Sequence, residues 1–201
     1  ELDFHAKPSG VTIEDVLARY DIPFTDFGIC VFHPVTSEAA SMGAQAQALF
    51  DRRKPSGRAV VLIAPNNDPG WREITAQINA LPTDQFRVLP SMRFAHFSEL
   101  MKHAACMVGN SSAGVREAPF LGLPSLDVGT RQNNRGKAPS IHFTDANDAP
   151  KIAEFLNGHW GQTDARDTAF GSGSAADRFA AILQDDDFWS GSLQKTFHDA
   201  G

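Results

Sequence analysis

The sequence has little cysteine, no excess of basic residues and no apolar run of membrane length, and each absence excludes a class of protein. Only two cysteines occur among 201 residues, Cys30 and Cys106, and both lie in apolar runs, as small buried residues outside any disulfide framework do. The 18 lysine and arginine residues face 24 aspartate and glutamate residues, so a net charge of −6 leaves no basic footprint for nucleic acid. Without a signal peptide or a membrane-length run, we expect a cytoplasmic protein with no membrane partner.

The residues that are present predict an α/β fold with one substantial core. Hydrophobic residues make up 42% and charged residues 21%, as in soluble globular proteins. Apolar runs predict short buried strands at 27–32, 59–64, 86–89, 106–108, 125–129 and 141–143. Between and around them, amphipathic patterns predict helices at 11–20, 37–52, 71–80, 94–104, 115–120, 148–156 and 175–183. This alternation predicts a parallel sheet with right-handed crossovers.

One run, residues 106–135, carries the strongest pattern for a binding site. A short apolar strand is broken at 109–110, and Ser111, Ser112 and Gly114 then lead into a helix that we expect to begin at Val115. The free N–H groups of a first helical turn attract anions, small side chains let a phosphate reach the backbone, and hydroxyls add donors. The alternative is that Ser111 or Ser112 only caps the helix.

Charged residues after this turn fit a nucleotide. Glu117, about one and a half turns into the expected helix, is placed to accept two adjacent hydroxyls such as those of a ribose, although it could simply complement the helix dipole. Arg131 and Arg135 follow the strand at 125–129 and would supply cationic donors to a diphosphate. The pattern indicates a nucleotide diphosphate held at the carboxyl ends of parallel strands.

Two further strand ends carry polar residues. His33 follows the strand at 27–32, where it would donate to a phosphate or transfer a proton, or serve as a structural turn residue. Asn66 follows the strand at 59–64 in a segment that is equally typical of a strand-to-helix turn. His96 and His103 show no spacing for metal ligands, so no metal site is expected. The glycine-rich run at 171–178 lacks the strand and the lysine of a phosphate loop, and is expected to start the helix at 175–183.

Four motifs occur in an order that resembles the UDP-N-acetylglucosamine 2-epimerases, specifically their hydrolysing branch. They are HPVTSE at 33–38, PNNDPG at 65–70, GNSSAGVREAP through GTRQNNR at 109–135, and FGSGSAADRF at 170–179. In the last motif, Ser172 and Ser174 stand where the usual family form has Asp and Asn. The resemblance runs from about residue 27 to residue 178, so it covers most of the chain.

The resemblance implies a Rossmann-like parallel sheet with helices on both faces, as one lobe of a two-lobe, glycosyltransferase-B-like fold. It matches the C-terminal lobe alone, so the N-terminal lobe, which carries acidic groups for acid–base chemistry, is expected as a missing partner. We divide the chain into an N-terminal arm and short helix at 1–26, a UDP-binding lobe at 27–184 and a helical tail at 185–201, with a helix-like stretch near 193–197. The full-length protein is expected to form a homo-oligomer.

The resemblance also implies the activity: release of UDP and an N-acetylmannosamine-type sugar from a UDP-sugar, without a cofactor, for sialic-acid-like sugar biosynthesis. His33 and Arg131 would be catalytic by neutralising charge on departing UDP, while the acid–base groups would lie outside this chain. The residues expected to bind substrate are Ser91 and Met92 near the uracil, Asn66 near the nucleotide sugar, Ser111, Ser112 and Gly114 at the diphosphate, Glu117 at the ribose, and His33 and Arg131 at the departing UDP. The alternatives are a UDP-sugar glycosyltransferase lobe and a non-catalytic nucleotide-sugar-binding domain.

Overall fold

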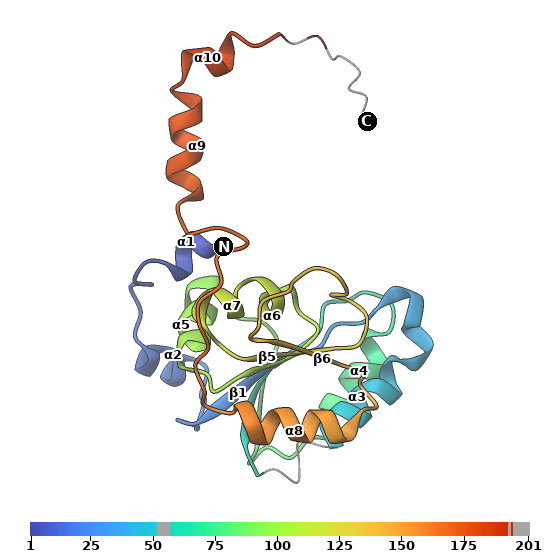
Figure 1. The fold of residues 1–201 in the computed structure, drawn as a ribbon. Coiled ribbons are helices and arrows are strands. Elements are labelled where there is room, and N and C mark those ends of the chain that lie inside the picture. Colours follow the sequence, from blue (N-terminus) through green and yellow to red (C-terminus); the bar gives the residue numbers. More distant parts are fainter. Residues whose placement is uncertain (52–56, 193, 195–201) are drawn as a thin grey trace.

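The protein is built on a six-stranded parallel sheet. A computed structural model describes residues 1–51, 57–192 and 194 and shows the strand order β3-β2-β1-β4-β5-β6 (Figure 1). The strands are β1 (Phe27–Val31), β2 (Ala59–Ile63), β3 (Phe86–Leu89), β4 (Met107–Gly109), β5 (Ser125–Val128) and β6 (Ile141–Thr144). The order reverses between β1 and β4, as in doubly wound nucleotide-binding folds. The predicted α/β class and parallel sheet are confirmed.

The sheet is buried on both faces because its central strands are apolar throughout. All five residues of β1 are buried, and they alternate between two cores. Phe27, Ile29 and Val31 enter one core, whereas Cys30 enters the other. A strand that is covered on both faces needs apolar residues at every position, which explains the continuous run in the sequence.

Helices cover both faces, as the resemblance implied. On one face lie α2 (Ile13–Arg19), α5 (Phe94–His103), α6 (Ser112–Arg116) and α7 (Ala118–Leu121). On the other lie α3 (Met42–Asp51), α4 (Trp71–Ile78) and α8 (Ala149–His159), and Figure 1 shows α8 across the sheet from α6 and α7. The remaining elements are α1 (Leu2–His5), the 3-10 helix η1 (Thr36–Ser41), α9 (Ala175–Leu183) and α10 (Asp186–Trp189).

The helix after β4 differs from its prediction. It begins at Ser112, three residues earlier than expected, and Glu117 separates it from α7, so Glu117 is not inside a continuous helix. Pro119 accounts for the break, because proline has no N–H to donate to the carbonyl of Val115, whereas it is tolerated in the first turn of a new helix, α7. The expected helix at 37–52 also begins as a 3-10 turn, η1, before α3.

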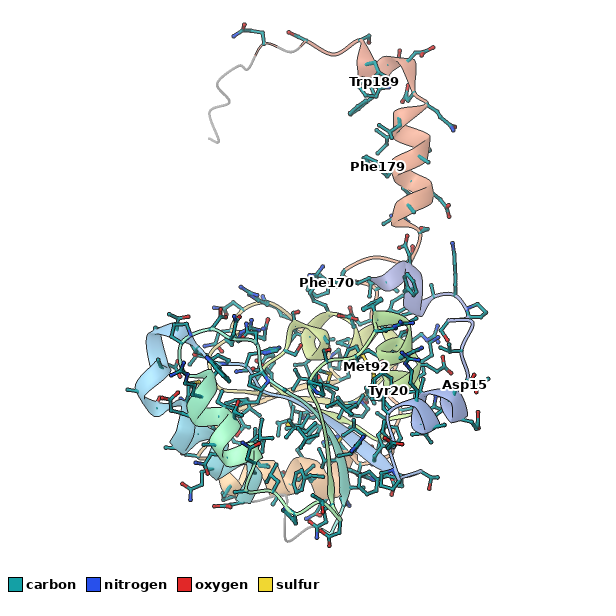
Figure 2. The ribbon with its side chains drawn as sticks, turned by 180° about the vertical axis from the view of Figure 1, so that it is seen from behind. Asp15, Tyr20, Met92, Phe170, Phe179 and Trp189 are labelled. Atoms are coloured by element: carbon teal, nitrogen blue, oxygen red, sulfur yellow. The ribbon has the colours of Figure 1, made fainter. Side chains whose placement is uncertain are left out.

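The two ends of the chain also differ from expectation. The segment expected to be an arm forms helix α1, and His5 at its end is buried. Helix α9, placed with the lobe in the sequence-based division, extends away from it together with α10, and both helices are exposed, with Phe179 and Trp189 on their surface (Figure 2). The sequence also predicts a turn at 54–57. This turn and the helix-like stretch near 193–197 lie largely outside the described residues. Within the described part of the chain, no helix has both the length and the apolar character needed to cross a membrane.

Candidate functional site

The candidate site lies at the carboxyl ends of the strands, beside the point where the strand order reverses. His33 follows β1, Asn66 follows β2 and Ser111 follows β4, so the parallel sheet delivers three predicted residues to one edge. This edge encloses a cavity of about 380 Å³. Its lining includes the predicted residues His33, Asn66, Ser91, Met92 and Ser111, together with Phe94 and Phe97.

The turn after β4 is shaped by Gly109. Its φ is +137°, and an added Cβ would lie 2.0 Å from the backbone oxygen of Val31. Only glycine fits such a position, because any other residue would clash with the neighbouring strand. The close approach of β1 and β4 therefore depends on this residue.

Asn110 is a site residue that the sequence reasoning missed. The His33 backbone N–H donates to Asn110 Oδ1 at 2.7 Å, and Asn110 Nδ2 donates to the His33 carbonyl at 2.8 Å. Asn110 is buried, and these two bonds join the ends of β1 and β4 across the reversal point. In the sequence, Asn110 stands directly after a buried strand and is the second residue of the GNSSAGVREAP motif.

In the turn after β4, which contains Ser111 and Ser112, one of the two serines caps the helix that follows. Ser111 Oγ accepts from the Ala113 N–H at 3.3 Å, so Ser111 caps α6. Its hydroxyl still has a proton to donate. The Gly114 N–H donates to the Ser111 carbonyl at 3.1 Å, so it is not free to donate to a ligand. Gly114 would contribute only the space that its missing side chain leaves. Ser112 is the first residue of α6 and is half-buried.

His33 is held as a neutral donor. Its Nδ1 accepts from the Asn66 N–H at 3.1 Å, so the ring proton belongs on Nε2. Burial, and next the positive charge of Arg131, lower the pKa of His33 to about 4. At neutral pH and without a ligand, His33 thus offers an N–H that carries no charge. Asn66 is fixed in turn by donating to Asp68 Oδ2 at 2.7 Å.

Arg131 supplies the positive charge at this edge. It is half-buried, and its guanidinium donates to the Asn110 carbonyl at 3.2 Å, an oxygen that also accepts from Gln132 Nε2 at 2.9 Å. Arg135 is exposed and donates to Gln132 Oε1 at 3.4 Å, so it lies one step further from the strand ends. The Arg131 guanidinium is therefore hydrogen-bonded directly to the turn at Asn110.

Asp127 is a buried carboxyl near this cation. It is 4% exposed, and no hydrogen-bond partner within the described residues reaches its buried Oδ2. Burial raises the pKa of Asp127 to about 6, although the charge of Arg131 opposes the shift. The sequence reasoning assigned Asp127 only to a strand.

Glu117 lies outside the cavity and has a partner that was not predicted. It is 5% exposed at the junction of α6 and α7, and its Oε2 is 2.7 Å from Nε2 of His5. The two residues are 112 positions apart. No local pattern in the sequence indicates this contact.

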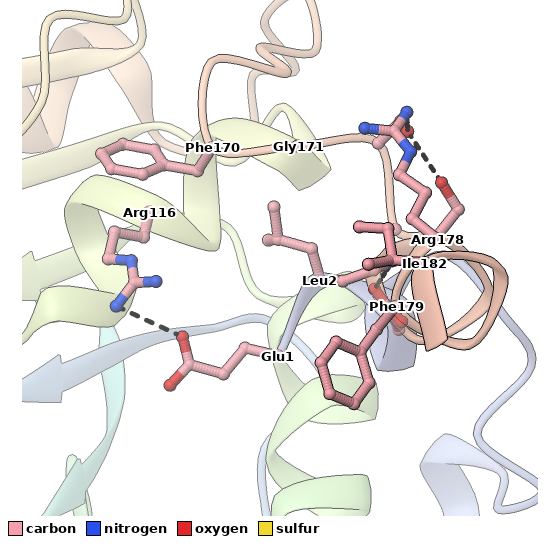
Figure 3. Close-up of a pocket in the computed structure, with 13 residues that line it drawn as sticks. Glu1, Leu2, Arg116, Phe170, Gly171, Arg178, Phe179 and Ile182 are labelled. Atoms are coloured by element: carbon pink, nitrogen blue, oxygen red, sulfur yellow. Dashed lines mark hydrogen bonds and ion pairs between the residues drawn. The ribbon is translucent and has the colours of Figure 1, made fainter. Parts of the chain in front are cut away.

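A second cavity, of about 510 Å³, lies beside α1 and α9 and includes none of the predicted site residues. Figure 3 shows Arg116 beside Phe170 and the ion pair between Arg116 and Glu1, with an N–O distance of 3.6 Å. No cluster of three or more histidine, cysteine or acidic side chains within the described ranges could hold a metal ion.

The sheet order and the polar edge define a Rossmann-like lobe of the glycosyltransferase-B-like class. A family model described as UDP-N-acetylglucosamine 2-epimerase matches residues 5–184. The UDP-N-acetylglucosamine 2-epimerase of Neisseria meningitidis serogroup B is 41% identical over 206 residues, which cover 99% of this chain and 54% of that protein. The chain belongs to the UDP-N-acetylglucosamine 2-epimerase family.

Other relatives agree with this assignment. The UDP-N,N′-diacetylbacillosamine 2-epimerase (hydrolyzing) of Legionella pneumophila is 28% identical over 119 residues, 58% of this chain and 32% of that protein. Among solved structures, the UDP-GlcNAc 2-epimerase of Methanocaldococcus jannaschii has a TM-score of 0.66 at 14% identity, over 85% of this chain and 49% of that one. A solved structure of a UDP-GlcNAc 2-epimerase from Neisseria meningitidis, bound to UDP-GlcNAc, has a TM-score of 0.60 at 13% identity, over 86% of this chain and 52% of that one. The chain spans about half the length of the Neisseria relative and of both solved structures.

Proposed function

We propose that this chain is the UDP-binding, C-terminal lobe of a hydrolysing UDP-N-acetylglucosamine 2-epimerase. The observation that carries the proposal is the convergence of His33, Ser111 and Arg131 at the carboxyl edge of the sheet, in a chain of this family. The Neisseria meningitidis structure is named as bound to UDP-GlcNAc, and a Staphylococcus aureus relative of the same fold as a complex with UDP. A UDP-sugar is the ligand that fits both the edge and the family.

The diphosphate would lie against the turn after β4. Ser111 and Ser112 offer hydroxyls there, and Gly114 has no side chain to obstruct the phosphates. The Arg131 guanidinium offers charge, and His33 Nε2 offers a neutral N–H, since its Nδ1 is already bonded to Asn66. Donors that are fixed in advance around developing negative charge lower the barrier to departure of UDP.

The nucleoside would extend along the cavity. Ser91 and Met92 line it after β3 and would contact the uracil through their backbones, beside the aromatic rings of Phe94 and Phe97. Asn66 would lie near the nucleotide sugar. Glu117 lies outside the cavity, so the ribose would have to reach the α6–α7 junction for Glu117 to accept its hydroxyls.

The reaction begins with elimination. The anomeric C–O bond breaks, UDP leaves with the bonding electrons, and a base removes the C2 proton to give an unsaturated sugar. Water then adds to give free N-acetylmannosamine or a relative of it. This lobe would stabilise UDP, whereas the base would belong to an N-terminal lobe, so the chain alone would bind UDP without turnover. The half-length match to the relatives supports this division.

The hydrolysing branch and the pathway rest on the names of distant relatives. The Legionella protein is called hydrolyzing, and an Escherichia coli relative, 25% identical over 131 residues, is called polysialic acid biosynthesis protein P7. A glycosyltransferase lobe would share the fold and the ribose carboxylate, but the family match favours the epimerase.

Proton NMR of UDP-N-acetylglucosamine incubated with this chain, and with a two-lobe protein that contains it, tests the proposal. The two-lobe protein should release UDP and free N-acetylmannosamine in equal amounts, while the chain alone should release neither. Formation of UDP-N-acetylmannosamine as the end product would refute the hydrolysing reaction. Turnover by the chain alone at the rate of the two-lobe protein would refute the division of roles between lobes.

A further inference from the structure

We propose that His5 is the positioning residue of Glu117, and that it turns this carboxylate toward the ribose of the bound nucleotide. The proposal rests on the proposed function, because it assumes that Glu117 binds the ribose. Its own content is that a residue of α1, in a segment before the first strand, sets the orientation of a binding group between α6 and α7.

The backbone of Glu117 is fixed, but its side chain depends on His5. The Glu117 N–H donates to the Ala113 carbonyl at 3.0 Å, and the Glu117 carbonyl accepts from the Leu121 N–H at 3.2 Å. Among the described residues, the one hydrogen-bond partner found for the carboxylate is His5 Nε2, at 2.7 Å. Rotation of the side chain is therefore restrained by His5.

His5 is itself held in one orientation. It is 4% exposed, its Nδ1 is 2.8 Å from Ser98 Oγ, and its ring meets the edge of Phe94 at a centroid distance of 5.6 Å. A carboxylate only accepts hydrogen bonds, so Nε2 must carry the proton that points to Glu117. In the neutral ring Nδ1 is then an acceptor, which the Ser98 hydroxyl satisfies by donating.

This arrangement leaves Glu117 able to bind a diol. A carboxylate has about four lone-pair positions, and His5 occupies one of them on Oε2. The remaining positions are sufficient for the two adjacent hydroxyls of a ribose. Charge-assisted bonds of this kind are stronger than those between neutral groups, so fixing the carboxylate in advance should improve nucleotide binding.

Helix α1 connects the His5–Glu117 contact to helix α9, near the C-terminal end of the chain. It packs against α5 and α7, and two residues before His5 the Asp3 carboxylate accepts from the Ala175 and Ala176 N–H groups at 3.0 and 2.9 Å. These N–H groups belong to the first turn of α9, which extends away from the lobe in Figure 1. Helix α1, a single helical turn, thus contacts Glu117 through His5 and the first turn of α9 through Asp3.

The experiment compares UDP with 2′,3′-dideoxy-UDP by calorimetry on the 201-residue chain. Wild type should bind UDP about tenfold or more tightly than the dideoxy compound, as expected for a charge-assisted hydrogen bond. His5→Phe should weaken the binding of UDP about tenfold and leave the binding of the dideoxy compound unchanged, so the ratio of the two affinities falls toward one. His5→Gln, whose amide can donate near the position of Nε2, should keep most of the ratio. His103→Gln, an exposed histidine of α5, is the control and should keep all of it.

Each outcome separates the two proposals. Equal weakening of both ligands in His5→Phe, or an unchanged ratio, would overturn the role of His5. If wild type does not prefer UDP, the ribose role of Glu117 fails, and the role of His5 fails with it. If His5→Phe does not fold, Ser98→Ala is measured instead; it removes the partner of Nδ1, and its ratio should fall below that of wild type, whereas an unchanged ratio would overturn the proposal.

Discussion

The side-chain amide of Asn110 binds the backbone of His33 at both its N–H and its carbonyl. These bonds, of 2.7 and 2.8 Å, join residues 77 positions apart at the end of neighbouring strands β1 and β4. The carbonyl of Asn110 also accepts a hydrogen bond from Arg131, so Asn110 connects His33, the turn that begins at Ser111 and the Arg131 guanidinium. Both the fold and the site depend on this link.

Asn110→Ala should therefore lower the free energy of unfolding by about 2 kcal/mol, because two buried hydrogen bonds are lost and the His33 backbone groups lose their partner. Urea denaturation measures this change. Asn147→Ala, in an exposed turn, is the matched control and should change stability by less than about 0.5 kcal/mol. An Asn110→Ala variant as stable as the control would contradict the structural role of Asn110.

Gly109→Ala should be more damaging. The new Cβ would lie 2.0 Å from the Val31 oxygen at a φ of +137°, so β1 and β4 must separate, at a cost of about 3 kcal/mol or more. Gly158→Ala, at an exposed position of α8, has open space around its Cβ and should stabilise by about 0.5 to 1 kcal/mol. Thermal unfolding of both variants tests the contrast, and equal effects would show that the sheet edge tolerates a side chain at position 109.

The sequence predicted those parts of the molecule that local patterns determine. The continuous apolar run at 27–32 predicted β1, and the polar residues after each strand predicted His33, Asn66 and Ser111 at one edge, because parallel strands end on the same side. The break at Glu117 was not predicted, because residues 115–120 keep a helical pattern on both sides of it. The contacts of Asn110 and His5 link residues 77 and 112 positions apart, and no periodicity encodes such pairings.

His33 should titrate near pH 4 in the absence of ligand and well above that value with UDP bound, since a diphosphate opposes the field of Arg131. NMR of the imidazole carbon resonances follows this titration, and Arg131→Gln should raise the pKa of His33 without ligand. Because the pKa of His33 is lowered on folding, the unfolded chain binds more protons between about pH 4 and 6.5. The stability that His33 contributes is thus complete above about pH 6.5 and is lost as the pH falls toward 4. A pKa near 6.5 in the absence of ligand would contradict this environment.

Asp127→Asn should stabilise the protein at pH 7 by about 1 to 2 kcal/mol, because it removes a buried carboxylate that has an unpartnered oxygen. The pKa of Asp127 is raised to about 6 on folding, so the native state holds a proton that the unfolded chain releases. The stability from this proton is complete below about pH 3.8 and is lost as the pH rises through 6. The advantage of the variant should accordingly shrink at pH 4. Urea denaturation at both pH values checks this, and a variant less stable than wild type at pH 7 would indicate that the carboxylate has a favourable role.

The most direct test of the central claim is a calorimetric titration of UDP into the 201-residue chain and its Arg131→Gln variant, with Arg166→Gln, an exposed arginine beside Phe120, as control. If this lobe holds the diphosphate, wild type and Arg166→Gln should bind one UDP with equal affinity, and Arg131→Gln should bind at least tenfold more weakly, since one charge-assisted contact is lost. Absence of UDP binding to wild type, or equal affinity in all three proteins, would contradict the account.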